Sequence, residues 1–202
     1  MEILRAEDRV IQQASVTEAT EAWLESRVKR YGAKSLFLPA GETPKPLYAR
    51  WRKSPPAYLR NLKLLQVDDV TTGAGKGVFA RFFREELPGF IVVPPVKEEG
   101  ADLAILGLGT NGHVAFHEPG IPFDFSFGEV DLHDDTARRL GLEPGTKGIT
   151  YGVGAFRKAQ AILLVVRGEN KREVYERLKK GDPSLPASGL LDHPDLTFLT
   201  EL

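Results

Sequence analysis

Apolar residues in this chain gather in short runs, and longer segments of mixed character separate them. Several of the runs are apolar at nearly every position, which is typical of strands buried on both faces of a parallel sheet. In the first intervening segment, Leu24, Val28 and Tyr31 recur at helical spacing. The predicted strands are residues 35–40, 62–67, 90–93, 101–106, 149–153, 161–166 and 196–199, and the predicted helices are residues 17–31, 44–51, 77–87, 136–140 and 170–180.

Residues that favour helix ends agree with this division. Ser15 and Thr17 are candidate N-caps of the first helix, and Gly32 is placed to end it. Thr43 is a natural N-cap for the second helix, with Pro44 as its first residue. Strands that alternate with helices predict an α/β fold with three layers, in which a Rossmann-like, mostly parallel central sheet is flanked by helices.

Composition narrows the class of protein. The 202 residues are enough for one substantial core, so we expect a single domain over residues 1–202. A net charge of −1 provides no general field for nucleic acid or a membrane surface, so phosphate chemistry requires a local site. The absence of Cys excludes disulfides and thiolate nucleophiles. A charged N-terminus and the lack of an apolar run of about 18–20 residues lead us to expect a cytoplasmic protein.

A glycine-rich loop follows the predicted strand at residues 101–106. Gly107, Gly109 and Gly112 satisfy G-x-G-x-x-G, a pattern that is also found in dinucleotide-binding proteins. That fingerprint requires a helix opening at the third glycine, where the pyrophosphate meets the helix N-terminus. Pro119 and the residues after it prevent a full helix here. We therefore expect no nicotinamide or flavin cofactor.

The same loop is better interpreted as catalytic. His113 and Glu118 lie five residues apart, and a carboxylate beside a His fixes its tautomer and raises its basicity. The alternative is a His satisfied by a backbone carbonyl and a solvated Glu. His117 could join them as a metal ligand, but the spacing matches no metal motif, so we expect no metal.

Ligands bind at the carboxyl ends of parallel strands, and further candidates follow predicted strands there. Asp68 and Asp69 end a strand, where a carboxylate could act as a base or simply form a turn. Residues 41–43, which are Gly41, Glu42 and Thr43, form either an anion cradle or an unliganded capped helix start. Lys171 could add a cation to such a site or lie in solvent.

These segments together resemble a known family. Residues 107–120 look like the central motif of glucosamine-6-phosphate deaminases, also called isomerases, whose superfamily includes the 6-phosphogluconolactonases. The continuation Ala-Phe-x-Glu-Pro-Gly after His113 is on the deaminase side. Residues 38–44, 66–69, 150–154 with 168–171, and 186–194 are similar to further family segments in the same order, so the resemblance covers most of the chain from Leu36 onward.

The resemblance implies roles for individual residues. His113 would protonate the ring oxygen of an amino-sugar phosphate, with Glu118 and Asn111 setting its tautomer. Asp68 would move the C2 proton to C1, and water would then release ammonia to give fructose 6-phosphate. This chemistry needs only acid–base groups, so the resemblance implies no cofactor and no metal.

For the phosphate end, the resemblance implies that the amides of residues 41–43 and Lys171 hold the 6-phosphate. The region between Gly120 and Ile149, which usually supplies a lid and a phosphate-binding Arg, looks shortened, and Arg138 or Arg139 would fill that role. Asn111 stands where some relatives carry Asp, and Glu42 where Gly is usual.

Two other functions remain open at this stage. One is hydrolysis of 6-phosphogluconolactone, in which His113 would activate water, and the other is a non-catalytic sugar-phosphate sensor. In each case the partner is a small-molecule sugar phosphate, with no nucleic acid and no membrane. A homo-oligomer is compatible with the sequence.

Overall fold

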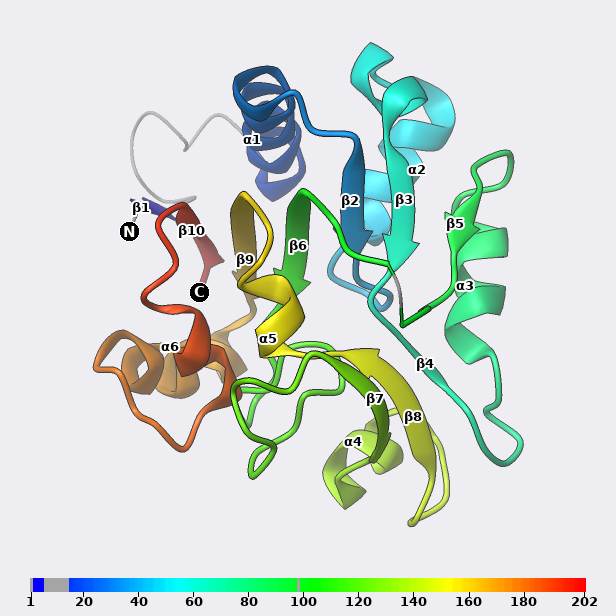
Figure 1. The fold of residues 1–202 in the computed structure, drawn as a ribbon, viewed down its shortest axis with the longest axis vertical. Coiled ribbons are helices and arrows are strands. Elements are labelled where there is room, and N and C mark those ends of the chain that lie inside the picture. The colour runs from blue at the N-terminus through cyan, green and yellow to red at the C-terminus, as the bar shows by residue number, and fades with distance from the viewer. Residues whose placement is uncertain (1, 6–14, 98) are drawn as a thin grey trace.

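A parallel sheet forms the centre of the molecule. The computed structural model describes residues 2–5, 15–97 and 99–202. Within these ranges the central sheet has seven strands in the order β1-β10-β9-β6-β2-β3-β5, and each neighbouring pair is parallel (Figure 1). The strands are β1 (Glu2–Arg5), β2 (Ser35–Leu38), β3 (Lys63–Gln66), β5 (Val92–Val93), β6 (Leu103–Gly107), β9 (Ala161–Arg167) and β10 (Leu196–Glu201).

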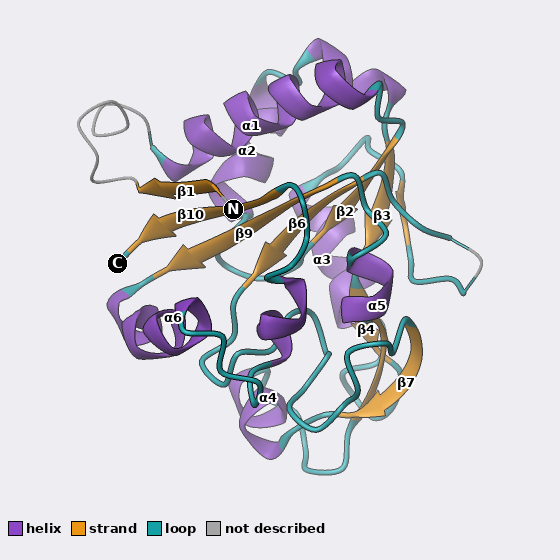
Figure 2. Ribbon diagram, turned by 60° about the vertical axis from the view of Figure 1, so that its left-hand side comes forward, coloured by secondary structure: helices purple, strands orange, loops and turns teal. Residues whose placement is uncertain are grey.

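Helices cover both faces of this sheet (Figure 2), which confirms the predicted three-layer α/β fold. Along β2, Leu36 and Leu38 pack on one face and Phe37 on the other, and all three are fully buried. Because helices cover both faces of the sheet, such strands have apolar residues at nearly every position of the sequence. The first face carries α1 (Val16–Tyr31), α2 (Lys45–Lys53) and α3 (Val78–Glu86), and the second carries α5 (Val153–Phe156) and α6 (Arg172–Lys179).

Helix ends follow the predicted capping residues in one case and depart from them in another. The Ser15 hydroxyl accepts the Glu18 N–H and the Glu18 carboxylate accepts the Ser15 N–H, while Gly32 ends α1 in the left-handed conformation. The predicted N-cap at Thr43 is wrong, because α2 begins one residue later and Pro44 occupies the cap position without a side-chain hydrogen bond. A turn through residues 41–44 precedes the helix, so Thr43 lies in the turn and not at the cap position. Pro44, which lies at that position, has no backbone N–H that requires an acceptor.

A second, smaller sheet was not predicted. It contains β4 (Asp68–Val70), β8 (Lys147–Tyr151) and β7 (Phe127–Asp131), which pair antiparallel in the order β4-β8-β7. The prediction that residues 68 and 69 end a strand is therefore wrong, since they begin β4. The partners of β4 lie about eighty positions away in the chain, so no local pattern marks the pairing. The short helix α4 (Asp134–Arg139) lies between β7 and β8 in the chain.

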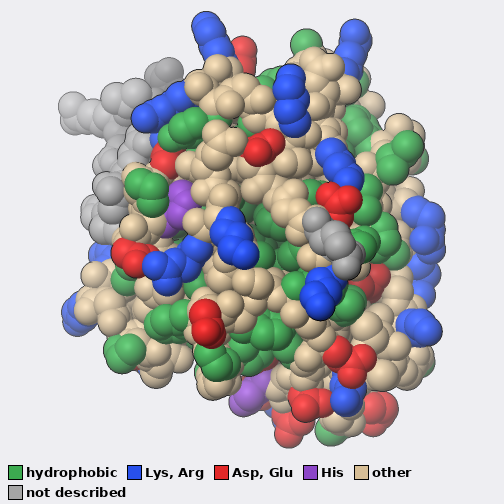
Figure 3. Space-filling model, in the orientation of Figure 1, with side chains coloured by type: hydrophobic (Ala, Val, Ile, Leu, Met, Phe, Trp, Pro, Cys, Tyr) green, Lys and Arg blue, Asp and Glu red, His purple; other side chains and the backbone are tan. Residues whose placement is uncertain are grey.

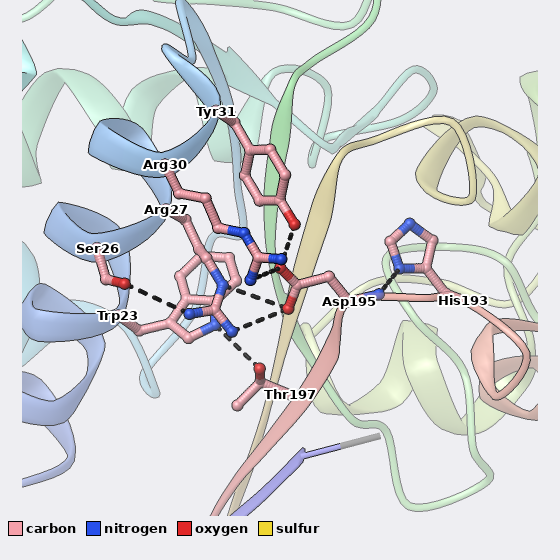
Figure 4. Close-up of polar contacts among 8 residues, drawn as sticks. All are labelled: Trp23, Ser26, Arg27, Arg30, Tyr31, His193, Asp195 and Thr197. Carbon is pink, nitrogen blue, oxygen red and sulfur yellow. Dashed lines mark hydrogen bonds and ion pairs between the residues drawn. The ribbon is translucent and has the colours of Figure 1, made fainter.

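Polar contacts join α1 to the start of β10 (Figure 4). Asp195 directly precedes β10 and the glycine-rich loop follows the parallel strand β6, so these contacts lie at the opposite end of the sheet from that loop. The Asp195 carboxylate accepts hydrogen bonds from Arg27 at 2.9 Å and from the Tyr31 hydroxyl at 2.6 Å. The Trp23 indole N–H donates to the Thr197 hydroxyl at 3.0 Å. Burial acts to raise the pKa of Asp195, but the hydrogen bonds from Arg27 and Tyr31 outweigh burial and the pKa is lowered. The charged form of Asp195 therefore stabilises the fold.

The surface carries charges of both signs. On the face shown in Figure 3, Lys and Arg side chains lie among Asp and Glu side chains, with apolar side chains between them. None of the helices in the described ranges has the length and apolar character that crossing a bilayer requires.

We predict that Asp195→Asn lowers the free energy of unfolding by about 1–3 kcal/mol, because a charged acceptor is lost and Arg27 stays largely buried. The stabilisation in the wild type is present above the ordinary carboxyl pKa and is lost as pH falls through the lowered folded value. Denaturant unfolding at pH 7 and at acid pH measures both effects, and the difference between wild type and variant should shrink at acid pH.

Asp192→Asn is the matched control, since Asp192 pairs with Arg157 at 2.7 Å but both side chains are exposed. Its unfolding free energy should change by less than about 0.5 kcal/mol. Equal effects of the two substitutions would contradict a stabilising role for the buried contacts of Asp195.

Candidate active site

The site lies where the strand order of the sheet reverses. The chain passes from β2 to β3 on one side and from β6 to β9 on the other, although β2 and β6 are neighbours. The loops after β2 and β6 therefore leave in opposite directions and open a crevice at the carboxyl ends of the strands. A cavity of about 240 Å³ lies there, lined by residues from both loops, from the start of β4, from α4 and by Lys171.

The glycines of the loop after β6 make room for their neighbours. A side chain at Gly109 would collide with the His113 ring, because a Cβ there would lie 2.5 Å from its atoms. Gly112 adopts a φ of 83° and packs against Leu185, 2.8 Å from where a Cβ would lie. The chain then turns back between Val114 and His117 in a short antiparallel bridge. The G-x-G-x-x-G spacing thus serves a tight loop, and the helix of the dinucleotide fingerprint does not follow, as predicted.

His113 and Glu118 are brought together, as expected from their spacing. Nδ1 of His113 lies 3.3 Å from Oε2 of Glu118, and the His ring lines the cavity. The contact is not aligned as a hydrogen bond, and Nδ1 has no other hydrogen-bond partner in the described ranges. Asn111 donates to the same Oε2 at 2.9 Å and its Oδ1 accepts the His113 N–H at 3.2 Å. Asn111 therefore supports the pair through Glu118 and the backbone.

The Glu118 carboxylate accepts a hydrogen bond at each of its two oxygens. Its other oxygen, Oε1, accepts the Thr136 hydroxyl at 2.5 Å, and the side chain is buried. Burial acts to raise its pKa, but His113, Thr136 and Asn111 together lower the pKa to about 2. Glu118 is therefore ionised at neutral pH and can orient the imidazole without taking its proton.

The two neighbouring carboxylates of β4 have different positions. Asp68 lines the cavity, and its pKa is raised well above its ordinary value by burial and then by the charge of Asp69. Asp69 faces away and accepts the N–H groups of Val70, Phe79 and Ala80 at 2.8, 3.0 and 3.1 Å, so it anchors the first turn of α3. Of the pair, only Asp68 is placed to act as a base on a bound molecule.

The loop after β2 has backbone N–H groups without a hydrogen-bond partner among the described residues. Gly41 lines the cavity with a φ of 103°, and in the described ranges no hydrogen bond occupies the N–H groups of Gly41, Glu42 or Thr43. The Glu42 carboxylate points into solvent, with 85% of its side chain exposed, and pairs with Lys45 at 2.5 Å. The carboxylate of Glu42 therefore leaves the anion cradle open.

Two cations from distant parts of the chain line the cavity. Lys171 precedes α6 and Arg139 ends α4. Burial, followed by the nearby charge of Arg139, lowers the pKa of Lys171 to about 8. Arg138 instead pairs with Asp135 at 2.7 Å and is 75% exposed. Of the two arginines offered by the sequence, Arg139 is the one that reaches the cavity.

His117 has a structural position. Its Nδ1 accepts the Val153 N–H at 3.1 Å, and its Nε2 lies 3.1 Å from the Ile121 carbonyl oxygen. Both ring nitrogens are occupied by backbone groups, so His117 fixes the loop and is not free to bind a metal. Thr136 is the site residue that sequence reasoning missed, because nothing near it in the chain marks it as a partner of Glu118.

The sequence profile of the family described as glucosamine-6-phosphate isomerases/6-phosphogluconolactonase matches residues 79–198, more than half of the chain. A glucosamine-6-phosphate deaminase of Bacillus cytotoxicus is 29% identical over 94% of this chain and 84% of its own length. One from Lysinibacillus sphaericus is 38% identical over 50% of this chain, a match that spans about half (46%) of that relative.

Solved structures show the same fold at lower identity. A monomeric glucosamine-6-phosphate deaminase superposes with a TM-score of 0.79 at 20% identity, over 99% of this chain and 97% of that one. A 6-phosphogluconolactonase from Thermotoga maritima gives 0.71 at 19% identity, over 99% of both chains. With the sequence profile, these findings establish that the chain belongs to the glucosamine-6-phosphate isomerase/6-phosphogluconolactonase family of enzymes.

Proposed function

We propose that the protein is a glucosamine-6-phosphate deaminase, which converts an amino-sugar phosphate and water to fructose 6-phosphate and ammonia. The observation that carries the proposal is the meeting of a buried base, a carboxylate-supported His and two cations in one cavity. Asp68, His113, Lys171 and Arg139 all line it. The relatives named deaminases support the same activity.

At the phosphate end, Lys171 and Arg139 bind the dianion together with the N–H groups of residues 41–43. Two positive side chains and free backbone N–H groups are the donors that proteins use for phosphate. This end fixes the sugar so that its ring oxygen faces His113. Glu118 holds the imidazole of His113 in one orientation. His113 then gives a proton to the ring oxygen of the sugar, and the sugar ring opens.

Asp68 then takes the proton from C2 of the open-chain amino aldehyde and returns it to C1 through an enolamine, which leaves an imine at C2. The ketose imine that results reacts with water, and its C2–N bond breaks to release ammonia. A base works best when its pKa is close to the working pH, and burial moves the pKa of Asp68 in that direction. This step needs no group beyond the side chains described.

Lactone hydrolysis is the second candidate, because the family profile includes 6-phosphogluconolactonases. It would use the same phosphate end and His113 to activate water, but it requires no proton transfer at C2. An ammonia-release assay with glucosamine 6-phosphate, run beside hydrolysis of 6-phosphogluconolactone, separates the two. Binding of a sugar phosphate without turnover of either substrate would favour the sensor.

We predict that Asp68→Asn reduces ammonia release by at least about 100-fold, since general-base catalysis contributes on the order of 10²–10⁴. In the wild type, kcat/KM should fall as pH drops through the raised pKa of Asp68, because only the carboxylate form removes the proton. The pH dependence of kcat/KM for ammonia release measures this fall, which forms the acid limb of the pH profile.

Asp69→Asn provides a comparison for the acid limb of this pH profile. It removes the charge that helps to raise the pKa of Asp68, so the acid limb should move to lower pH. It also weakens the contacts with α3, so thermal unfolding must be measured in parallel. An Asp68→Asn enzyme that releases ammonia at the wild-type rate would remove Asp68 from the mechanism.

We predict that Arg139→Gln raises KM for the sugar phosphate by about 10- to 100-fold, the loss expected for one charged hydrogen bond. Arg138→Gln, at the adjacent exposed position, should leave KM within about 2-fold of the wild type. Equal KM values for the two variants would contradict the assignment of Arg139 to the phosphate end.

Phosphate binding should also weaken as pH rises through about 8, where Lys171 loses its proton. Isothermal titration with glucose 6-phosphate between pH 7 and 10 measures this change. Lys171→Met should bind more weakly at pH 7 and show a flatter pH dependence. A wild-type affinity that stays constant across this range would argue against Lys171 as a phosphate ligand.

A further inference from the structure

Thr136 occupies a position that connects the two ends of the cavity. It lies on α4, its side chain is buried, and its hydroxyl donates to Oε1 of Glu118 at 2.5 Å. Arg139 lies three residues further on the same helix, and residues three apart share a face. Thr136 and Arg139 both line the cavity. One short helix thus contacts the carboxylate of the acid–base pair and presents a cation to the phosphate end.

Apolar packing also holds this helix. Within α4 the buried residues are Thr136 and Ala137, and Ala137 packs in a small apolar cluster with Val70, Phe116 and Leu132. The remaining residues of α4 are exposed, and the hydrogen bond from Thr136 to Glu118 joins the helix to the glycine-rich loop.

We propose that Thr136 is a positioning residue, which holds Glu118 beside His113 and through α4 ties the placement of Arg139 to that pair. The inference rests on the proposed function, since it assigns Arg139 to the phosphate and His113 to the acid–base step. Glu118 has three partners, and each oxygen is fixed by a donor: Oε1 by Thr136 and Oε2 by Asn111. With Thr136 removed, the carboxylate can rotate about its contact with Asn111 and lose its place beside Nδ1 of His113.

The charged and titratable groups around Glu118 define what a pH measurement will report. His113 and His117 lie on the same loop. Across the cavity, the other ionisable groups that line it are Asp68 at the start of β4, Arg139 on α4 and Lys171 before α6. Removing the Thr136 hydroxyl takes away one donor to the ionised carboxylate, so the pKa of Glu118 should rise from about 2 towards its ordinary value of 4.5.

The test compares Thr136→Val, Thr136→Ser and Thr146→Val with the wild type. Thr146 is the matched control, because it is buried to the same degree (7% exposed, against 6% for Thr136) and donates to the backbone oxygen of Glu143 at 2.6 Å. The measurements are the carboxyl titration of Glu118 by carbon NMR, the ring tautomer of His113 by nitrogen NMR, kcat and KM for glucosamine 6-phosphate, and the affinity for inorganic phosphate.

We expect Thr136→Val to raise the pKa of Glu118, to give a mixed His113 tautomer and to lower kcat by about 10- to 100-fold, the range for a hydrogen bond to a charged group. Phosphate binding should weaken although Arg139 is unchanged. Thr136→Ser keeps the hydroxyl, so the pKa of Glu118 and the His113 tautomer should match the wild type. Its kcat and its affinity for phosphate should lie within about 3-fold of the wild-type values. Thr146→Val should match the wild type.

An unchanged Glu118 titration and His113 tautomer in Thr136→Val would overturn the inference. Thr136→Ala, which removes the hydroxyl without placing a methyl group against Glu118, provides the same comparison where the Val variant does not fold. A wild-type protein that binds phosphate but releases no ammonia would refute the proposed function alone. The NMR and phosphate measurements would still decide the role of Thr136.

Discussion

The buried carboxylate of Glu118 is the group around which the candidate site is organised. Asn111, Thr136 and His113 approach it from the loop after β6 and from α4, and each contributes to keeping it charged in a buried place. An unpaired carboxylate at this depth would be costly, because burial favours the neutral form. Thr136 and Asn111 donate hydrogen bonds to it, and the imidazole of His113, which faces the cavity, lies 3.3 Å away.

The topology of the sheet sets where this group can meet a substrate. Because the strand order reverses between β2 and β6, the loop that carries His113 faces residues 39–41 of the loop after β2 across a crevice. The small antiparallel sheet then adds Asp68 and supports α4, which follows β7 in the chain. The cavity is thus assembled from the parallel sheet and the antiparallel sheet, with Asp68, the proposed base, on the second.

Much of the fold follows from local patterns in the sequence. Runs of apolar residues mark β2, β3, β6, β9 and β10, because strands covered on both faces bury every side chain. The capping residues of α1 are local signals as well, since Ser15 and Glu18 satisfy each other within one turn. The second helix departs from its predicted start at Pro44 with Thr43 as the cap, since a turn through residues 41–44 moves the start to Lys45.

The sequence by itself determined the α/β class, the glycine-rich loop with His113 and Glu118, and the set of charged residues from which the site is drawn. Tertiary structure alone decided which members of that set meet. It turned Asp69 towards α3 and left Asp68 at the cavity, chose Arg139 over Arg138, and brought Thr136 to Glu118. These choices depend on side chains separated by 10 to about 100 positions, and contacts over such separations leave no periodic pattern in one sequence.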